Sequence, residues 1–564
     1  MQPESWRAIR SASTEQRVNG ASDPITLALT GAVPFMLLAS TGIALPLSLW
    51  LLRSYRRAVL RGMNQAAGAS AQPAPAPAMP SSTPAARLEF ATLSARPGVA
   101  AALPGPSPWR VAVSLAIAIA FYAAVMTAAW LLATQDDALG AVKLAVLFWS
   151  YFWPAVLVVN LVAATDRATR FVVAAVYFVF YVLLAGIALA RSPTLTPLHL
   201  AQHWLVTNGP PTLLLAAFLA RRIRAVGPMV LAFTLLALFG SAVAAWLVGA
   251  SDETIRAAVA VGGALGLGGR GTFWLTLALG LTTFGVAAWF ALRALGAHYA
   301  AKRFSDEMLT VDAIMLIFAV TQSIGLVFNH WAWIGSGPVA YLAFRAAATA
   351  SRRRLPRVEA PRRLLLLRVF AVGARSEPLF DALRRRWLRA GSIALIAGPD
   401  LVTSTVEPDE FLAFLSGRLQ RTFVASEADL AARLAAMDRG PDPDGRFRVN
   451  EFFCRADTWQ ATMQRLVAES DAVLMDLRSF GPSNQGCLFE LGRLLDAIDL
   501  RRVVFVIDRS TDAAFLRQAL SRLWSNLAAD SPNRTAPEPA ARLLEISGPT
   551  AAESRALVGH LAAD

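Results

Sequence analysis

Residues 470–498 read SDAVLMDLRSFGPSNQGCLFELGRLLDAI, and this stretch decides the fold of the C-terminal part of the chain. The run AVLMDL (472–477) is apolar on both faces, which is typical of a parallel strand covered by helices on each side. A loop rich in Gly, Pro and Asn follows, and GCLFELGRLLDAI (486–498) reads as a helix. One carboxylate, Glu490, lies in the first turns of that helix, among apolar neighbours.

The same alternation of strand-like and helix-like runs extends over residues 364–564. Predicted strands are 364–372, 392–398, 446–454, 472–477 and 502–508, and 541–547 is a candidate edge strand. Predicted helices are 376–391, 407–419, 426–438, 457–470 and 486–498. Strands that alternate with helices and lack polar faces predict an α/β doubly wound, flavodoxin-like domain.

The first 350 residues have a different composition. The whole chain of 564 residues is 55% hydrophobic and only 16% charged, whereas soluble domains carry about 25% charged residues. Nine apolar runs are long enough to cross a bilayer: 25–52, 111–133, 142–164, 171–191, 199–220, 226–249, 272–292, 309–328 and 331–350. We therefore predict an all-α transmembrane bundle of about nine spans over residues 25–350.

Charge predicts how this bundle lies in the membrane. Basic residues cluster after every second span, at 53–61, 167–170, 221–224, 293–303 and 352–357, whereas Asp136, Asp137, Asp252 and Glu253 lie in the intervening loops. Arg-rich loops face the cytoplasm, so we expect the tail 1–24 outside and the Arg-rich linker 351–363 and the α/β domain inside. Few Lys and many Arg and Ala are typical of a GC-rich bacterial genome, which predicts a bacterial inner-membrane protein.

Composition also bears on the loops and on the class of partner. Residues 66–108 include AQPAPAPAMPSSTPAA and predict a flexible, disordered cytoplasmic loop. Residues 364–564 hold 24 Arg against 26 Asp and Glu, a net charge of −2, so the remaining residues carry +16 and the whole chain carries +14. Because no basic stripe with interleaved aromatics is present, nucleic acid is an improbable partner. We expect no metal and no resident cofactor.

The loop after 472–477 is the predicted ligand site. In open parallel sheets, ligands bind beyond the carboxyl ends of the strands. The predicted ligand-binding residues here are Asp476, Arg478, Phe480, Asn484 and Gly486, together with Trp459 as a second aromatic candidate. Glu490, about one turn into the following helix, is the predicted catalytic residue. An ordinary structural acid, favoured by the helix dipole, is the alternative for Glu490.

The pattern of Asp471, the apolar strand 473–477, Gly486 and Glu490-Leu491-Gly492 resembles that of nucleoside 2-deoxyribosyltransferases and of TIR domains. Cys487 before Glu490-Leu491 is also similar to TIR sequences. In both families one essential glutamate lies on the helix after such a strand and loop. The resemblance implies cleavage of an N-glycosidic bond, in a nucleoside or in NAD.

The sequence thus predicts a multi-pass membrane protein whose cytoplasmic TIR-like domain binds a nucleotide-type ligand. A carboxylate beneath C1′ can stabilise or attack the sugar cation formed when a C1′–N bond breaks. Two alternatives remain open at this point. One is a non-catalytic sensor whose α/β domain binds a ligand or forms a homo-oligomer. The other is a transporter with a regulatory domain, although no intramembrane chain of acids supports it.

Overall fold

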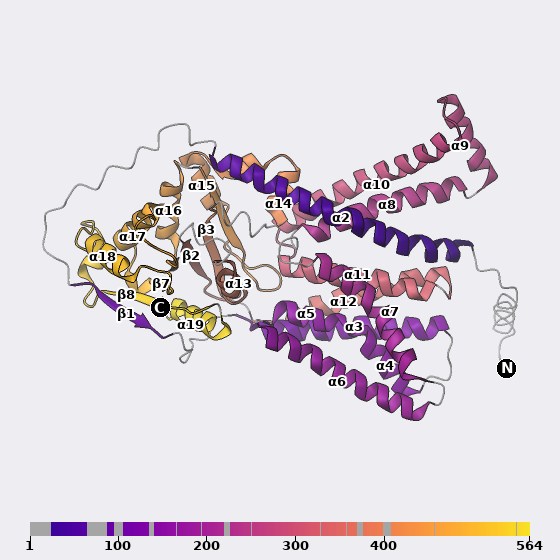
Figure 1. Ribbon diagram of the computed structural model, residues 1–564, viewed down its shortest axis with the longest axis horizontal. Coiled ribbons are helices and arrows are strands. Elements are labelled where there is room, and N and C mark those ends of the chain that lie inside the picture. Colours follow the sequence, from indigo (N-terminus) through magenta and orange to yellow (C-terminus); the bar gives the residue numbers. More distant parts are fainter. Residues whose placement is uncertain are drawn as a thin grey trace.

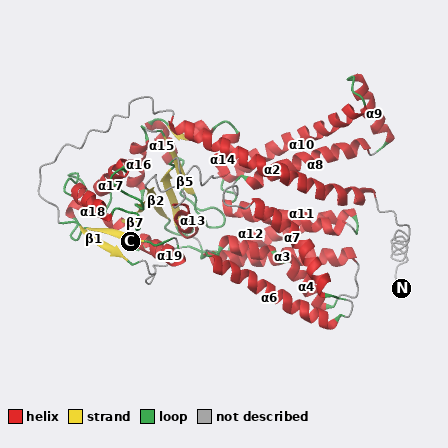
Figure 2. Cartoon of the chain, in the orientation of Figure 1, coloured by secondary structure: helices red, strands yellow, loops and turns green. Residues whose placement is uncertain are grey.

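The computed structural model describes residues 24–64, 87–94, 105–134, 140–164, 166–192, 195–218, 226–249, 251–327, 329–356, 358–368, 376–398, 408–455, 457–548 and 550–563. A helical part and an α/β part lie side by side along the long axis of the molecule (Figure 1). All the strands lie at one end, in the α/β part (Figure 2). The apolar first part of the sequence and its α/β second part thus form two separate regions of the structure.

The helical part contains α2 (Pro24–Asn64), α3 (Pro108–Thr134), α4 (Ala141–Tyr151), α5 (Pro154–Val162), α6 (Arg167–Arg191), α7 (Pro197–Phe218), α8 (Gly227–Gly249), α9 (Asp252–Ala264), α10 (Gly269–Ala300), α11 (Asp306–Val327) and α12 (Ser336–Arg352). Among the described residues, α3, α6, α8, α10 and α11 are long and apolar enough to span a membrane, and the bent pair α4–α5 would make a sixth span. The other three predicted spans coincide with α2, α7 and α12, which are not among these six. Nine spans therefore stays a prediction.

A proline and a buried amide explain the bend of 42° between α4 and α5. Pro154 has no N–H, so the carbonyl of Ser150 loses its helical donor. The side chain of Asn208 replaces that donor, since Nδ2 lies 3.1 Å from the Ser150 carbonyl oxygen. Asn208 in turn accepts a hydrogen bond from Gln322 (3.2 Å), which accepts one from Tyr122 (2.7 Å). This buried chain of polar side chains ties α3, α11, α7 and α4 together.

The α/β part is built on one parallel sheet of eight strands. These are β1 (Glu89–Leu93), β2 (Arg362–Arg368), β3 (Gly391–Ile396), β4 (Phe423–Val424), β5 (Val449–Cys454), β6 (Ala472–Asp476), β7 (Val503–Ile507) and β8 (Ala540–Glu545). Their order is β1-β8-β7-β6-β2-β3-β5-β4, and every neighbouring pair is parallel. The apolar runs of the sequence correctly predicted a parallel sheet, but with fewer strands.

Helices cover both faces of this sheet, which explains why its strands lack polar alternation. Leu365 of β2 and Val473 of β6 point to one face, into a core formed with α15 (Glu427–Ala435), α16 (Trp459–Glu469), α17 (Gln485–Ala497) and α18 (Ala513–Trp524). Leu364 and Leu474 point to the other face, against α13 (Ser376–Trp387), α19 (Ala551–Ala562) and the end of α2. All four of these leucine and valine side chains are fully buried.

The structure corrects the prediction that residues 66–108 form a disordered loop. Glu89–Leu93 is strand β1, which pairs in parallel with β8 and makes it an inner strand of the sheet. Leu88, just before β1, is buried in the core of the sheet. Residues 87–94 fold because β8 supplies the backbone partners of β1 and the core of the sheet accepts Leu88. Residues 66–86 and 95–104 of the predicted loop lie outside the described residues.

Candidate functional site

The predicted site lies where the order of the strands reverses. β2 lies between β3 and β6 in the sheet. The chain leaves β2 toward β3 on one side, and it later returns from β5 to form β6 on the other side of β2. In parallel sheets the carboxyl ends of two such strands border a crevice that can hold a ligand. The last residues of these strands, Arg368 and Asp476, lie opposite each other in register. Both side chains are buried.

Asp476 and Arg478 bind each other. The Arg478 guanidinium donates through Nε (2.8 Å) and Nη2 (2.6 Å) to the two carboxylate oxygens of Asp476. The Arg478 backbone N–H adds a bond of 3.2 Å to the same carboxylate. Burial works to lower the pKa of Arg478, but the bonds to Asp476 outweigh it and raise that pKa. This fork-like pair fixes the start of the loop after β6.

The rest of that loop is held by contacts to the loop after β7. Ser479 has a φ of 61°, a left-handed conformation that lets the chain turn sharply after Arg478. The Phe480 carbonyl accepts a hydrogen bond from the Asp512 N–H (2.9 Å), and its ring packs 5.6 Å from that of Phe515. Phe480 is buried in the core. Its surroundings are those of a packing residue, rather than of an exposed platform for a base.

Asn484 and Gly486 lie at the start of α17. Asn484 is the N-cap residue, and its side-chain oxygen accepts from the Gly481 N–H at 2.9 Å. A Cβ added at Gly486 would meet no atom within 4 Å, so the protein chain itself does not require glycine there. The other aromatic candidate, Trp459 at the start of α16, is partly buried, with its ring edge-on to Phe489 at 5.4 Å.

Glu490 is the unusual member of this group. It lies on the buried side of α17 and is only 2% exposed. Its Oε2 atom has no hydrogen-bond partner. Burial raises the pKa of this carboxyl from 4.5 to about 8, and the positive charge of Arg368 offsets only part of the rise. A buried carboxyl of this kind is neutral at physiological pH, and such groups are common at functional sites.

Two further residues belong to this environment. Cys487, one turn before Glu490, is buried, and burial followed by the neighbouring Glu490 raises the pKa of its thiol to about 12. It is therefore an unreactive thiol. Arg368 was missed in the sequence. The signal was available, because LLLLR ends a buried strand with a charged residue, just as AVLMD does.

The structure thus groups Glu490, Arg368 and the Asp476–Arg478 pair at one edge of the sheet, with Phe480, Asn484 and Gly486 in the adjoining loop. The segments that follow β2 and β3, residues 369–375 and 399–407, lie outside the described residues. Within the described part of the chain, no group of three His, Cys, Asp or Glu side chains could hold a metal ion.

A cavity of about 210 Å³ lies elsewhere, where the helical part meets the α/β part. Its walls include Tyr299 and Asp306 from the helical part and Glu410, Arg448 and Glu451 from the α/β part. It is distinct from the group around Glu490.

Comparison with known proteins adds no family to this description. The chain matches no protein-family model, no curated protein and no solved structure.

Proposed function

We propose that this chain is a multi-pass inner-membrane protein whose cytoplasmic α/β domain is TIR-like and binds a ligand containing an N-glycosidic bond beside Glu490. The strand order supports the proposed flavodoxin-like arrangement. With β4, β5 and the added strand β1 set aside, the order β3-β2-β6-β7-β8 equals the flavodoxin order 2-1-3-4-5. In this arrangement α17, which carries Glu490, directly follows the strand beside the switch point.

The observation that carries the proposal is the buried Glu490 with an unpartnered Oε2. Leaving a buried polar atom without a partner costs about 1–3 kcal/mol. A ligand that forms a hydrogen bond with this atom would recover part of that cost. Arg368 and the Asp476–Arg478 pair line the same edge. The ligand would therefore meet both positively charged donors and a negatively charged acceptor.

The neutral state of Glu490 favours one type of chemistry. In hydrolysis of a nucleoside, the C1′–N bond breaks, its electron pair leaves with the base, and the base nitrogen takes the proton from Glu490. Water then adds to C1′ and returns a proton to the Glu490 carboxylate. General acid catalysis of this kind requires a carboxyl group protonated near neutral pH. Nicotinamide leaves NAD without needing a proton, so a neutral Glu490 suits a nucleoside better than NAD.

A base-release assay tests this function. The full chain in lipid nanodiscs is incubated with purine nucleosides or NAD, and free base is measured by chromatography. We expect release from nucleosides, and a loss of about 100-fold or more in Glu490→Gln, because the amide has no proton to transfer. Glu469→Gln is a matched control, since Glu469 forms an exposed ion pair with Arg439 at 2.6 Å. Absence of release, or equal release by Glu490→Gln, would refute the enzymatic proposal.

A non-catalytic sensor is the second candidate. The observation that favours it is the set of ion pairs between the helical part and the α/β part, such as Lys302 with Asp438 (2.5 Å) and Glu307 with Arg389 (2.7 Å). Nucleoside binding by calorimetry without base release would favour this function over catalysis.

A further inference from the structure

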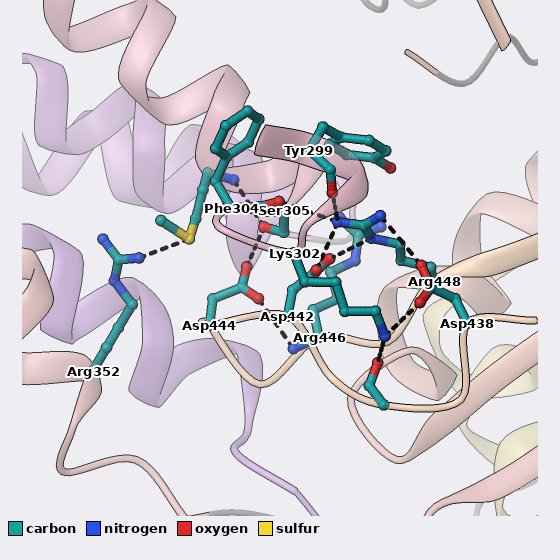
Figure 3. A network of polar contacts seen from close by, with 12 residues as sticks. Tyr299, Lys302, Phe304, Ser305, Arg352, Asp438, Asp442, Asp444, Arg446 and Arg448 are labelled. Atoms are coloured by element: carbon teal, nitrogen blue, oxygen red, sulfur yellow. Dashed lines mark hydrogen bonds and ion pairs between the residues drawn. The ribbon is translucent and has the colours of Figure 1, made fainter. Parts of the chain in front are cut away.

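The turn between α10 and α11 is the main polar contact of the helical part with the α/β part. It contacts the loop 438–448, which precedes β5 (Figure 3). The Lys302 ammonium group lies 2.5 Å from Asp438 and donates to the Gly440 carbonyl at 2.9 Å. Ser305 Oγ donates to the carboxylate of Asp444. The turn therefore binds both the beginning and the middle of this loop.

Arg448 is the centre of this contact. Its guanidinium stacks on the ring of Tyr299 at 3.9 Å and donates to the Tyr299 carbonyl, the last turn of α10, at 2.7 Å. It also forms a fork with Asp442, with distances of 2.9 and 2.8 Å, and an ion pair with Asp438 at 3.2 Å. Its side chain is 9% exposed and that of Asp442 is 2% exposed. Arg448 is therefore held in one position by groups from both parts.

A second ion pair joins α11 to the neighbouring strand. Glu307, in the first turn of α11, lies 2.7 Å from Arg389 and 3.6 Å from Arg446. Arg389 precedes β3 by two residues, as Arg448 precedes β5 by one. Since β3 and β5 are adjacent and parallel, both are held at their amino-terminal ends. The candidate ligand edge lies at the opposite, carboxyl-terminal ends of the strands.

We propose that this contact is a coupling joint, through which a displacement of α10 and α11 moves the amino-terminal ends of β3 and β5. The joint comprises Tyr299, Lys302, Ser305 and Glu307 of the helical part and Arg389, Asp438, Asp442, Asp444, Arg446 and Arg448 of the α/β part. Its contacts are directional ion pairs and hydrogen bonds, so a shift of either helix must move these arginines or break their bonds. The inference is independent of the proposed enzymatic function.

The structure provides a lever with which to move α10. Gly280 packs against α8, and a Cβ added there would lie 2.3 Å from the Gly240 carbonyl oxygen and 2.7 Å from the Ala244 Cβ. Gly280→Ala must therefore push α10 away from α8. Gly285 lies on the same helix, and a Cβ there would meet no atom within 4 Å. Gly285→Ala is the matched control.

Hydrogen–deuterium exchange of the full chain in nanodiscs reads out the joint. We expect Gly280→Ala to speed exchange in Val449–Cys454 by about tenfold, the scale of a local opening, and Gly285→Ala to leave it unchanged. In an Arg448→Gln background the effect of Gly280→Ala on that strand should be clearly smaller, because the central contact is lost while the contacts of Lys302, Ser305 and Glu307 remain. β7 (Val503–Ile507) does not touch the joint and should exchange at the wild-type rate in all variants.

A second pair of variants tests the joint without the lever. Lys302→Gln removes a partly exposed group, and it should speed exchange in 299–308 and in Val449–Cys454 together. Arg439→Gln removes the same charge from an ion pair inside the α/β part and should leave 299–308 unchanged. The proposal is overturned if Gly280→Ala leaves β5 unchanged, if its effect is as large with Arg448→Gln as without it, or if β7 responds equally, which would indicate global opening.

Discussion

Replacing Glu490 by glutamine is expected to stabilise the α/β part, and to do so increasingly as the pH rises. Gln has nearly the same shape as Glu but cannot ionise. In the folded protein the carboxyl is buried with one unpartnered oxygen, so its charged form is disfavoured. In the unfolded chain the same carboxyl is solvated and ionises at its ordinary pKa. Above pH 4.5 the wild type therefore loses folding stability, because unfolding allows Glu490 to ionise. The glutamine variant has no such loss.

The size of this cost follows from the pKa of Glu490, which is 4.5 in solution and about 8 in the fold. The folded-state pKa is raised, so the folded protein holds its proton more tightly, and this stabilisation is complete below pH 4.5. It is lost as the pH rises from 4.5 to 8, at about 1.4 kcal/mol per pH unit. The total loss is on the order of 5 kcal/mol. Glu490→Gln should show little gain at pH 5 and a gain of about 3 kcal/mol at pH 7.

Native-state hydrogen exchange of α17 and β6 in the full chain measures the difference at each pH. The ratio of protection factors, variant to wild type, should increase by about two orders of magnitude between pH 5 and pH 7, because 1.4 kcal/mol is a factor of ten. A constant ratio would refute the argument, since it would mean that Glu490 has an ordinary pKa in the fold.

Glu553→Gln is the matched control for this pH series. Glu553 accepts hydrogen bonds from Ser547 N (2.8 Å) and Thr550 N (3.1 Å) at the start of α19. Partial burial works to raise its pKa, but these hydrogen bonds outweigh it and lower the pKa below 4.5. The stabilisation that the Glu553 carboxylate contributes is complete above the pKa of the unfolded chain. It is lost only as the pH falls through the lower pKa of the folded protein. The effect of Glu553→Gln should therefore be flat from pH 5 to 8.

Three further substitutions have defined outcomes. Asp476→Asn leaves the Arg478 guanidinium buried without its counter-ion and should destabilise the α/β part by about 3–5 kcal/mol in a denaturant titration. Asn208→Leu removes the side-chain donor to the Ser150 carbonyl at the α4–α5 bend, leaving only the longer bond from the Trp153 N–H (3.3 Å), and should cost about 1 kcal/mol, measured as a lower thermal midpoint. Leu88→Asp places a charge in the core beside β1, and it should speed exchange of β8 without changing that of β3.

The sequence predicted the fold best for strands that are buried on both faces. Runs such as AVLMD and VVFVI have no polar face, and only a sheet covered on both sides accommodates them. The Gly-, Pro- and Asn-rich loop likewise marked the start of α17, which was predicted as 486–498 and is observed at Gln485–Ala497. β1 was missed because EFATL is short, none of its five residues is fully buried, and it pairs with a strand about 450 residues away. No local pattern encodes such a partner, and a lone strand has no stability of its own.

The candidate site could be located from the sequence, but its interactions could not. The rule for the carboxyl ends of strands identifies the loop after β6 and hence Asp476, Arg478 and Glu490. It does not show that Asp476 and Arg478 bind each other, because that fork depends on the side-chain conformations of the two residues. Nor does it show that Glu490 is neutral, since its pKa depends on residues from other elements that bury it.

The boundary between the two parts, finally, is not a point in the sequence. The α2 helix runs beyond the predicted span, and Tyr55, Val59 and Met63, spaced four residues apart on one side of it, are buried against the sheet. The Tyr55 hydroxyl donates to Glu410 at 2.8 Å.

The chain then adds β1 to the sheet and returns to α3 through Gly105, whose φ of 141° suits only glycine. A Cβ at Gly105 would lie 2.0 Å from the Arg389 carbonyl oxygen, so the chain passes close to the backbone of this joint residue. A fragment that begins near residue 360 would lack the end of α2 and β1, and would expose the apolar face that the α2 residues cover and the β8 edge. The α/β part is therefore completed by segments that precede α3 in the sequence, the end of α2 and β1.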